Sequence, residues 1–359
     1  MKFSFTNNTG GKYSSEQIYF VIIGKNSTGQ FCHVDKDGNL VPCNDSDNDA
    51  PGHLTKNEQN WCNYLHTVSE VTEIQVPKID SGRAYISLGS PTYLKIVNNG
   101  YGFVGPNPAN PSDANADVYF DWLEFTIDDA GFHGNTTQVD QFGFPMTVEL
   151  TASDGFSKKL GITESRTALF SEYMASVPTE FQSMVQAPYR IVAPFKGNFS
   201  RGQNYETYFD SYIAEMWQYY VSNELVFTTN EGTFAGKVEN KVFAFTKDGD
   251  VDRKYIIDYP TSAEVFECAG VFAKGDATEK VIQSQVSAML NRHILGSPEN
   301  RYTPEEYYKN SPANYYAQFW HLHSIDNKAY GFPFDDVCEQ STLLEHHNPE
   351  ELKVTISWN

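Results

Sequence analysis

The first part of the chain is a succession of short runs of β-branched and aromatic residues, each bounded by glycine, proline or asparagine. Runs of this length with turn residues between them predict β-strands rather than helices. The strongest runs are residues 19–24, 83–89, 93–97, 118–127 and 144–152. Strands at such regular spacing are typical of an antiparallel β-sandwich or β-barrel. We expect one of these folds for residues 1–153.

A different pattern begins near residue 154. Apolar residues recur at helical spacing in 204–220 and 278–295. Thr303, followed by Pro304 and two glutamates, is typical of a helix start. Strand-like runs occupy residues 224–229 and 241–246. We therefore expect a mixed α/β domain over residues 154–324.

The end of the chain is again β-like. The natural partner of the run at 351–358 is the equally β-like N-terminal run at 2–6. We expect residues 325–359 to complete the β domain, so that the α/β domain is an insertion. A wide acidic groove is expected between the two domains.

Charge limits the partners of this chain. Its 359 residues include 26 Lys and Arg against 46 Asp and Glu, a net charge of −20. Such a surface repels phosphate backbones and anionic membranes, so we expect neither nucleic acid nor membrane as a partner. No signal-peptide core precedes the first strand, so an exported protein would be present here in its mature form. The 22 Tyr, 25 Phe and 5 Trp suit stacking on sugar rings, although an aromatic β core explains them better.

The chain has five cysteines, an odd number that excludes a complete set of disulfides. A hairpin turn centred on Asp37–Gly38 would put Cys32 directly opposite Cys43, within disulfide range. We hypothesise a Cys32–Cys43 bridge, and hence an oxidising compartment. Two reduced cysteines in the hairpin are the alternative.

The most informative segment is 120–145. Alternation along a strand divides its side chains between two faces. The apolar face has Leu123, Phe125 and Ile127, and the polar face has Trp122, Glu124, Thr126 and Asp128. A hairpin centred on residue 132 would put Asp140 on the same face as Glu124. Two carboxylates that flank a bond, one acid and one base, are the minimum for glycoside hydrolysis. With 46 acidic residues in the chain, a chance pair on a solvated surface is the alternative.

This segment resembles the signature of glycoside hydrolase family 64, the endo-acting β-1,3-glucanases related in fold to thaumatin-like proteins. The resemblance rests on the run Phe120–Thr126 and on Val139–Asp140 followed by Pro145, with Asp140 sixteen residues after Glu124. Further segments resemble the family in the same order: residues 82–90, 259–273, 288–295 and 314–337. The resemblance therefore covers most of the chain.

The resemblance implies a role for several residues. Glu124 corresponds to the general acid and Asp140 to the general base of an inverting mechanism. The residues implied to contact substrate are Trp122, Thr126, Asp128, His133, Thr137, Tyr330 and Asp335. For Tyr330 and Asp335 the alternative is a role as turn residues that stabilise the fold. Asp128 and His133 depart from the amide and the large aromatic residue expected at their positions, which weakens the expected sugar stacking. Cys268 is implied to be a free, buried thiol, because the second cysteine expected near Ser287 is absent.

Other residues do not make a convincing metal site. His321 and His323 form a His-x-His pair and His346 is followed by a second histidine, but nothing supplies a closed set of ligands. The acidic run at 45–49 begins like a calcium loop, yet Ala50 and Lys56 stand where that loop needs Gly and Glu. We expect structural histidines, a plain acidic loop, no metal and no cofactor.

The resemblance to family 64, taken with these patterns, implies a secreted bacterial hydrolase. It is expected to be a monomeric endo-acting glycosidase that cleaves extended or triple-helical β-1,3-glucan, such as laminarin or curdlan, with inversion. The expected products are short laminari-oligosaccharides such as laminaripentaose. A sequon at Asn135, beside the proposed site, argues for a source that does not N-glycosylate. The alternatives are a non-catalytic thaumatin-like protein that binds β-1,3-glucan, and a hydrolase of another glycan.

Overall fold

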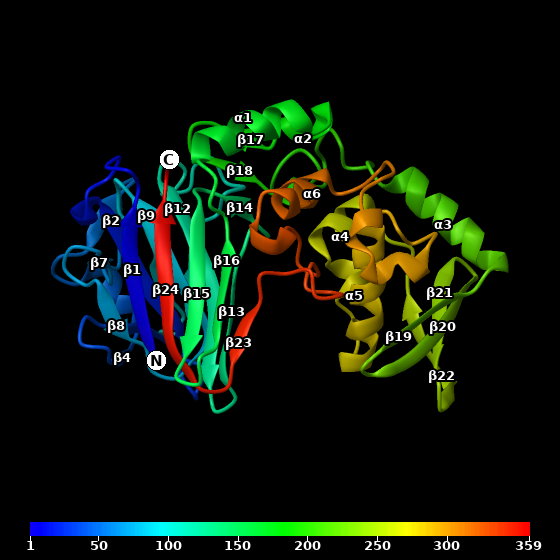
Figure 1. The fold of residues 1–359 in the computed structure, drawn as a ribbon, viewed down its shortest axis with the longest axis horizontal. Helices are drawn as coiled ribbons and strands as arrows, with labels where there is room; N and C mark the ends of the chain where they lie inside the picture. The colour runs from blue at the N-terminus through cyan, green and yellow to red at the C-terminus, as the bar shows by residue number, and fades with distance from the viewer.

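The computed structural model describes residues 1–359. The chain is mainly β, with several sheets that are largely antiparallel and few helices. Figure 1 shows the two largest sheets face to face on one side of the molecule, while most helices gather on the other side. None of these helices is both long enough and apolar enough to cross a bilayer.

One large sheet joins the two ends of the chain. Its five strands follow the order β16-β15-β24-β1-β8. They are β16 (Ser157–Gly161), β15 (Met146–Ala152), β24 (Pro349–Ser357), β1 (Lys2–Asn8) and β8 (Glu73–Gln75). The predicted pairing of the terminal runs is confirmed, because β24 lies beside β1 with Val354 opposite Phe5; the two strands run parallel (Figure 1).

The second large sheet carries the segment singled out in the sequence. It has eight strands in the order β23-β13-β12-β9-β2-β3-β4, with β7 also paired to β2. They are β23 (Leu344–His346), β13 (Gly131–Thr136), β12 (Tyr119–Asp128), β9 (Ile79–Leu88), β2 (Ile18–Lys25), β3 (Phe31–Val34), β4 (Leu40–Pro42) and β7 (His66–Thr67). In this sheet β12 is a central strand, flanked by β9 and β13.

Both large sheets contribute to one cluster of 27 buried residues. Phe3 and Val354 enter it from the first sheet, and Leu123 and Phe125 enter it from β12 of the second. Apolar burial of this kind is the main driving force for folding, at roughly 1.5–3 kcal/mol for each large side chain. Because neighbouring residues of a strand point to opposite faces, burial of Leu123 and Phe125 directs Glu124 to the other face of the sheet.

A smaller cluster of 13 buried residues lies on that other face. It includes Tyr85, Phe120 and Trp122 from the sheet, covered by segments with short hairpins. These hairpins are β5 (Leu54–Lys56) with β6 (Gln59–Trp61) and β10 (Lys95–Val97) with β11 (Gly102–Val104). Residues 107–117 contain neither strand nor helix.

The helical side has its own cluster of 46 buried residues. The helices are α1 (Arg166–Ser176), α2 (Thr179–Gln182), α3 (Asp210–Ser222), α4 (Ser262–Glu267), α5 (Ala277–Asn291) and α6 (Tyr315–Leu322). One sheet here pairs β14 (Gln141–Phe142), β18 (Arg190–Val192) and β17 (Val185–Gln186). The other pairs β19 (Leu225–Thr229), β20 (Gly232–Glu239), β21 (Val242–Lys247) and β22 (Asp250–Ile257).

Most expected elements are present, and one is much shorter than predicted. The helix expected from Thr303 is a three-residue 3₁₀ turn, Pro304–Glu306, and the Thr303 side chain caps nothing. The helix expected over 204–220 begins only at Asp210. Its first residues form turns instead, because the Phe209 N–H is bonded to the Ser262 hydroxyl, a tertiary contact that the sequence pattern does not contain.

The predicted Cys32–Cys43 bridge is wrong. All five cysteines are free, and the hairpin pairs Cys32 with Pro42 rather than with Cys43. The Asp35 carboxylate accepts the N–H groups of Asp37 and Asn39, and Gly38 adopts a positive φ of 82°. This tight loop shifts the register by one residue and turns the two cysteine side chains to different faces. The oxidising compartment inferred from the bridge loses its support.

Candidate active site

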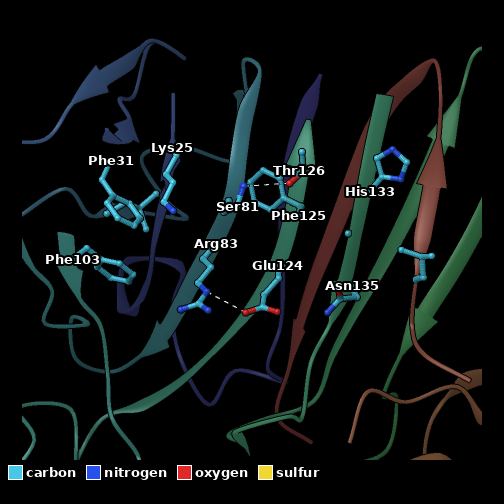
Figure 2. Close-up of a pocket in the computed structure, with 14 residues that line it drawn as sticks. Lys25, Phe31, Ser81, Arg83, Phe103, Glu124, Phe125, Thr126, His133 and Asn135 are labelled. Atoms are coloured by element: carbon cyan, nitrogen blue, oxygen red, sulfur yellow. Dashed lines mark hydrogen bonds and ion pairs between the residues drawn. The ribbon is translucent and has the colours of Figure 1, made fainter. Parts of the chain in front are cut away.

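Glu124 lies near the middle of β12, on the face of the sheet opposite the large core. Arg83 on β9 and Asn135 on β13 are its direct neighbours across the sheet. The Arg83 Nε is 3.1 Å from Glu124 Oε1 (Figure 2). The indole N–H of Trp122 donates to the same oxygen over 3.3 Å. The ion pair with Arg83 and the hydrogen bond from Trp122 therefore engage the same carboxylate oxygen, and no side-chain hydrogen bond reaches Oε2.

The hairpin that follows Glu124 differs from the prediction. Its turn is Asp129–Ala130, so Asp128 pairs with Gly131 and Glu124 pairs with Asn135, not with Asp140. The turn is tight because the Asp128 carboxylate accepts the Ala130 N–H. A centre at residue 132 was therefore wrong, and Asp140 lies beyond the end of β13, in the link that leads to β14.

The Asp140 link is bonded to the helical side of the molecule. The Asp140 carbonyl accepts the Ala193 N–H at 2.9 Å, and Asp140 Oδ1 is 3.1 Å from the Lys196 ammonium. Two residues earlier, the Gln138 N–H donates to the Tyr330 carbonyl and the Gln138 carbonyl accepts the Tyr316 hydroxyl. Asp140 is thus positioned by contacts that are distant in sequence.

Glu124 and Asp140 act on the same neighbouring groups. Burial alone would lower the pKa of Arg83. The attraction of nearby Tyr85, Glu124 and Asp140 for its positive charge outweighs burial, so the pKa of Arg83 is raised. The pKa of Tyr85 is raised by burial and, to a smaller extent, by the same two carboxylates. The fold therefore brings the two predicted acids into one electrostatic neighbourhood, although it does not pair them across a hairpin.

A cavity of about 620 Å³ lies over this face of the sheet (Figure 2). Its lining combines charged, polar and aromatic groups. It is lined by Ile23, Lys25, Phe31, Ser81, Gly82, Arg83, Phe103, Glu124, Phe125, Thr126, His133, Gly134, Asn135 and Leu343. Asp140 does not line this cavity. A concave surface with a carboxylate and a few convergent polar groups is typical of a ligand site.

Two of the residues implied to bind substrate line the cavity. Thr126 accepts the Ser81 N–H at 3.2 Å and pairs across the sheet with His133. His133 Nδ1 is 3.3 Å from the Glu345 carboxylate, and its side chain is 43% exposed. Both side chains project from the same face as Glu124, as Figure 2 shows. Asp128 is exposed in the turn at the end of β12 and does not line the cavity.

Three other residues implied to bind substrate are buried, which corrects their expected place on an open surface. Trp122 is 4% exposed and packs on Tyr85 and Phe120. Thr137 is 2% exposed, and its hydroxyl accepts the Val139 N–H. These side chains hold the site together and offer no surface to a sugar ring.

Asp335 is the third buried residue, and it is fully enclosed. Its carboxylate bonds Arg292 at 3.0 Å, His321 at 2.9 Å and the Gly331 N–H at 2.9 Å. Burial alone would raise the pKa of Asp335, but the contacts with His321 and Arg292 outweigh it and the pKa is lowered. Tyr330 precedes Gly331 in the chain and is half-buried. Burial raises the pKa of Tyr330, and the negative charges of Asp336 and Glu124 raise it further.

The motif residue Asp121 has a structural role. It is 3% exposed and accepts the N–H groups of Trp122 and Gly143. Burial raises the pKa of Asp121 to about 7, despite these bonds. A side chain at Gly143 would collide with the Phe120 carbonyl, so glycine is needed for this close approach. Asp121 thereby ties the segment after Asp140 to β12.

The histidines and the acidic loop have protein partners. His321 lies on α6, not on a strand, and its two ring nitrogens contact Asp335 and the Asn327 carbonyl. His323 Nδ1 is 2.8 Å from Glu164 and 3.6 Å from Glu172. These three side chains are of types that bind metals, but here they contact one another. Residues 45–49 form a 3₁₀ turn whose three carboxylates accept bonds from Gly100, Tyr64 and Asn60.

Two residues of the site, Arg83 and Lys196, were not found from the sequence. The only available signal for Arg83 was a charged residue at the start of the strand-like run 83–89, which becomes informative once β9 is known to pair with β12. Lys196 ends a short 3₁₀ turn, Pro194–Lys196, with no motif around it.

Known proteins are similar to this chain in sequence. A family model described as β-1,3-glucanase, of glycoside hydrolase family 64, matches residues 1–356. The glucan endo-1,3-β-glucosidase of Cellulosimicrobium cellulans is 30% identical over 289 residues, 77% of this chain and 52% of that protein. That of an Arthrobacter strain is 29% identical with the same coverage. The chain spans about half the length of these curated relatives.

Solved structures are similar over the whole chain. The β-1,3-glucanase domain from Clostridium beijerinckii has a TM-score of 0.96 and 41% identity, and the match covers 100% of this chain and 98% of that one. A laminaripentaose-producing β-1,3-glucanase from Paenibacillus barengoltzii, complexed with laminarihexaose, has a TM-score of 0.81 and 36% identity. That match covers 100% of this chain and 75% of the other.

Proposed function

Because the chain belongs to glycoside hydrolase family 64, the β-1,3-glucanase family, we propose that it hydrolyses β-1,3-glucan as an endo-acting, inverting enzyme. The observation that carries the proposal is that Glu124 lies in an open cavity while Glu124 and Asp140 act on the same neighbours, Arg83 and Tyr85. The bacterial relatives named as glucan endo-1,3-β-glucosidases, and the relative complexed with laminarihexaose, support this substrate class.

In the proposed mechanism Glu124 is the general acid. Arg83 and Trp122 both bond Oε1, so Oε2 can carry the proton that passes to the leaving glycosidic oxygen. The guanidinium of Arg83 then stabilises the carboxylate that remains, because an adjacent opposite charge favours the ionised form. The indole of Trp122 fixes the orientation of the acid.

Asp140 is the proposed general base. Its Oδ1 contacts Lys196 and its Oδ2 has no protein partner, so Oδ2 is available to a water molecule. That water would attack the anomeric carbon from the face opposite the leaving group, with inversion. The cavity residues Thr126 and His133, the exposed Asp128 and the half-buried Tyr330 are proposed to contact the flanking sugars.

The architecture is proposed to serve an extended polymer. We propose a thaumatin-like β domain of residues 1–153 and 325–359, an inserted domain of residues 154–324, and a groove between them wide enough for triple-helical glucan. Separate buried clusters support a division into two parts, but they cross these bounds: Phe142 and Phe332 belong to the helical cluster, and Leu160 belongs to the cluster between the large sheets. A monomeric, secreted bacterial protein is part of the same proposal.

The test is incubation of the protein with laminarin and curdlan, followed by measurement of reducing ends and chromatography of the products. Short laminari-oligosaccharides such as laminaripentaose are expected from an early stage. Cellulose, xylan and lichenan serve as comparison substrates. Binding to laminarin without release of sugars would favour the non-catalytic alternative, and faster release from another glycan would reassign the substrate.

A further inference from the structure

Asp140 and Lys196 form an ion pair between two segments that are 56 residues apart. Lys196 Nζ is 3.1 Å from Asp140 Oδ1, and the two side chains are 25% and 31% exposed. A pair that is this far removed from water interacts more strongly than a fully exposed pair. Lys196 thus contacts the proposed general base without being one of the two acid–base residues itself.

The backbone around Lys196 fixes its position relative to Asp140. Strand β18 pairs with β14, with Val192 opposite Gln141, and the Ala193 N–H extends this pairing by one bond, to the Asp140 carbonyl. Val192 and Ala193 are fully buried. The 3₁₀ turn Pro194–Lys196 then directs the lysine back toward the carboxylate. One buried element thus holds both the main chain and the side chain of Asp140.

The other charged and polar groups near Asp140 already have partners elsewhere in the protein. The guanidinium of Arg83 contacts Glu124 at 3.1 Å and the Tyr85 hydroxyl at 3.2 Å. The Tyr316 hydroxyl, whose pKa is raised by burial, donates to the Gln138 carbonyl. Lys196, whose ammonium also lies 4.9 Å from the centre of the Phe195 ring, is the cation in direct contact with Asp140.

We propose that Lys196 is a positioning residue that holds Asp140 Oδ1 and thereby turns Oδ2 toward the attacking water. Resting on the proposed role of Asp140 as general base, this inference extends the site to the helical side of the molecule. Fixing Oδ1 restricts rotation of the carboxylate before substrate arrives, which is how a supporting residue improves catalysis.

The test is Lys196→Met, which keeps the length of the side chain and removes its charge. We expect kcat on laminarin to fall about 10-fold with little change in KM, less than the ~10²–10⁴ loss expected without the base. Lys196→Arg should restore most of the activity, because arginine again places a cation beside Asp140 Oδ1.

Lys247→Met is the matched control. Lys247 also pairs with a carboxylate, Glu231, lies near a phenyl ring, that of Phe234, and has a side chain that is 24% exposed. The control should leave kcat unchanged. Melting temperatures of all variants separate a catalytic effect from loss of fold.

The outcomes separate this inference from the proposed function. An inactive wild-type protein, or an active Asp140→Asn variant, would overturn the proposed function itself. An active wild type and an inactive Asp140→Asn variant, together with Lys196→Met that keeps wild-type kcat, would overturn only the role of Lys196. A folded Lys196→Met variant whose loss is not restored by arginine would also contradict it, because arginine retains the charge.

Discussion

Arg83 and Glu124 face each other directly across the β9–β12 ladder, with Nε 3.1 Å from Oε1. Direct opposition on neighbouring strands is a rigid arrangement, because the pairing of the two strands fixes both Cβ positions. The proposed acid is therefore oriented by the sheet itself. The proposed base is oriented by a loop that the helical side of the molecule holds.

The first prediction concerns the two carboxylates. Glu124→Gln and Asp140→Asn should each reduce the rate of laminarin hydrolysis by ~10²–10⁴, the usual contribution of an acid–base group. Circular dichroism should show an intact fold. Asp129→Asn, at an exposed acid in the β12–β13 turn, is the control and should keep full activity. More than a tenth of the activity in either site variant would mean that the residue is misassigned.

The second prediction concerns Arg83. Replacing it by methionine should lower kcat about 10-fold, because the carboxylate left after proton transfer loses its adjacent charge. Steady-state kinetics on laminarin measure kcat for the variant and for wild type. A wild-type kcat in the folded variant would contradict the role assigned to Arg83.

The third prediction concerns His133, which stands where the family resemblance implies a large aromatic residue. Its side chain lines the cavity opposite Thr126 and is 43% exposed, so a larger ring can be accommodated toward solvent. His133→Trp should lower KM for long laminarin chains about 2- to 10-fold, the value of one aromatic contact. His133→Leu, which is apolar but has no ring, is the control. An unchanged or higher KM for the tryptophan variant would remove His133 from the sugar-binding surface.

How far the sequence predicted this site depends on the kind of contact. The two faces of β12 followed from alternation alone, because burial of Leu123 and Phe125 leaves Glu124 no other side. The hairpin register did not follow. The register is decided by the Asp128 carboxylate, which accepts the Ala130 N–H and closes a two-residue turn. The free-energy difference between this short turn and a longer loop is small, so the sequence alone does not choose between them.

Contacts between distant segments were beyond the sequence. Lys196 reaches Asp140 only because β18 pairs with β14, two strands of three and two residues that have no periodic pattern. The same holds for Asp335, whose neighbours Arg292 and His321 come from the end of α5 and from α6. A charged residue in a motif-like segment can be a ligand or a buried partner, and only the packing distinguishes the two.

The fourth prediction concerns that buried network. Asp335→Asn should lower the free energy of unfolding by about 3–5 kcal/mol at neutral pH, because it leaves Arg292 as a buried cation without its partner. The pKa of Asp335 is lowered in the folded protein, since His321 and Arg292 outweigh burial. Its contribution to stability is therefore complete above the ordinary carboxyl pKa and is lost as the pH falls through the folded-state value. Urea unfolding should show the gap between wild type and variant shrinking in acid; a gap that widens there would contradict the network.

The last prediction is the stereochemistry of the reaction. A retaining glycosidase needs its two carboxyl groups ~5–5.5 Å apart, about the spacing of directly opposed side chains on neighbouring strands. In this chain Asn135, not Asp140, occupies the place opposite Glu124. Asp140 approaches from a separate loop and keeps Oδ2 without a protein partner, an arrangement that leaves space for the water of an inverting reaction, in which the separation is ~6.5–9.5 Å. NMR of freshly cleaved laminarin should therefore show the α-anomer first. Initial β-anomer would make Asp140 a nucleophile. It would also contradict the proposed role of Lys196, which is to hold Oδ1 so that Oδ2 can bind the attacking water.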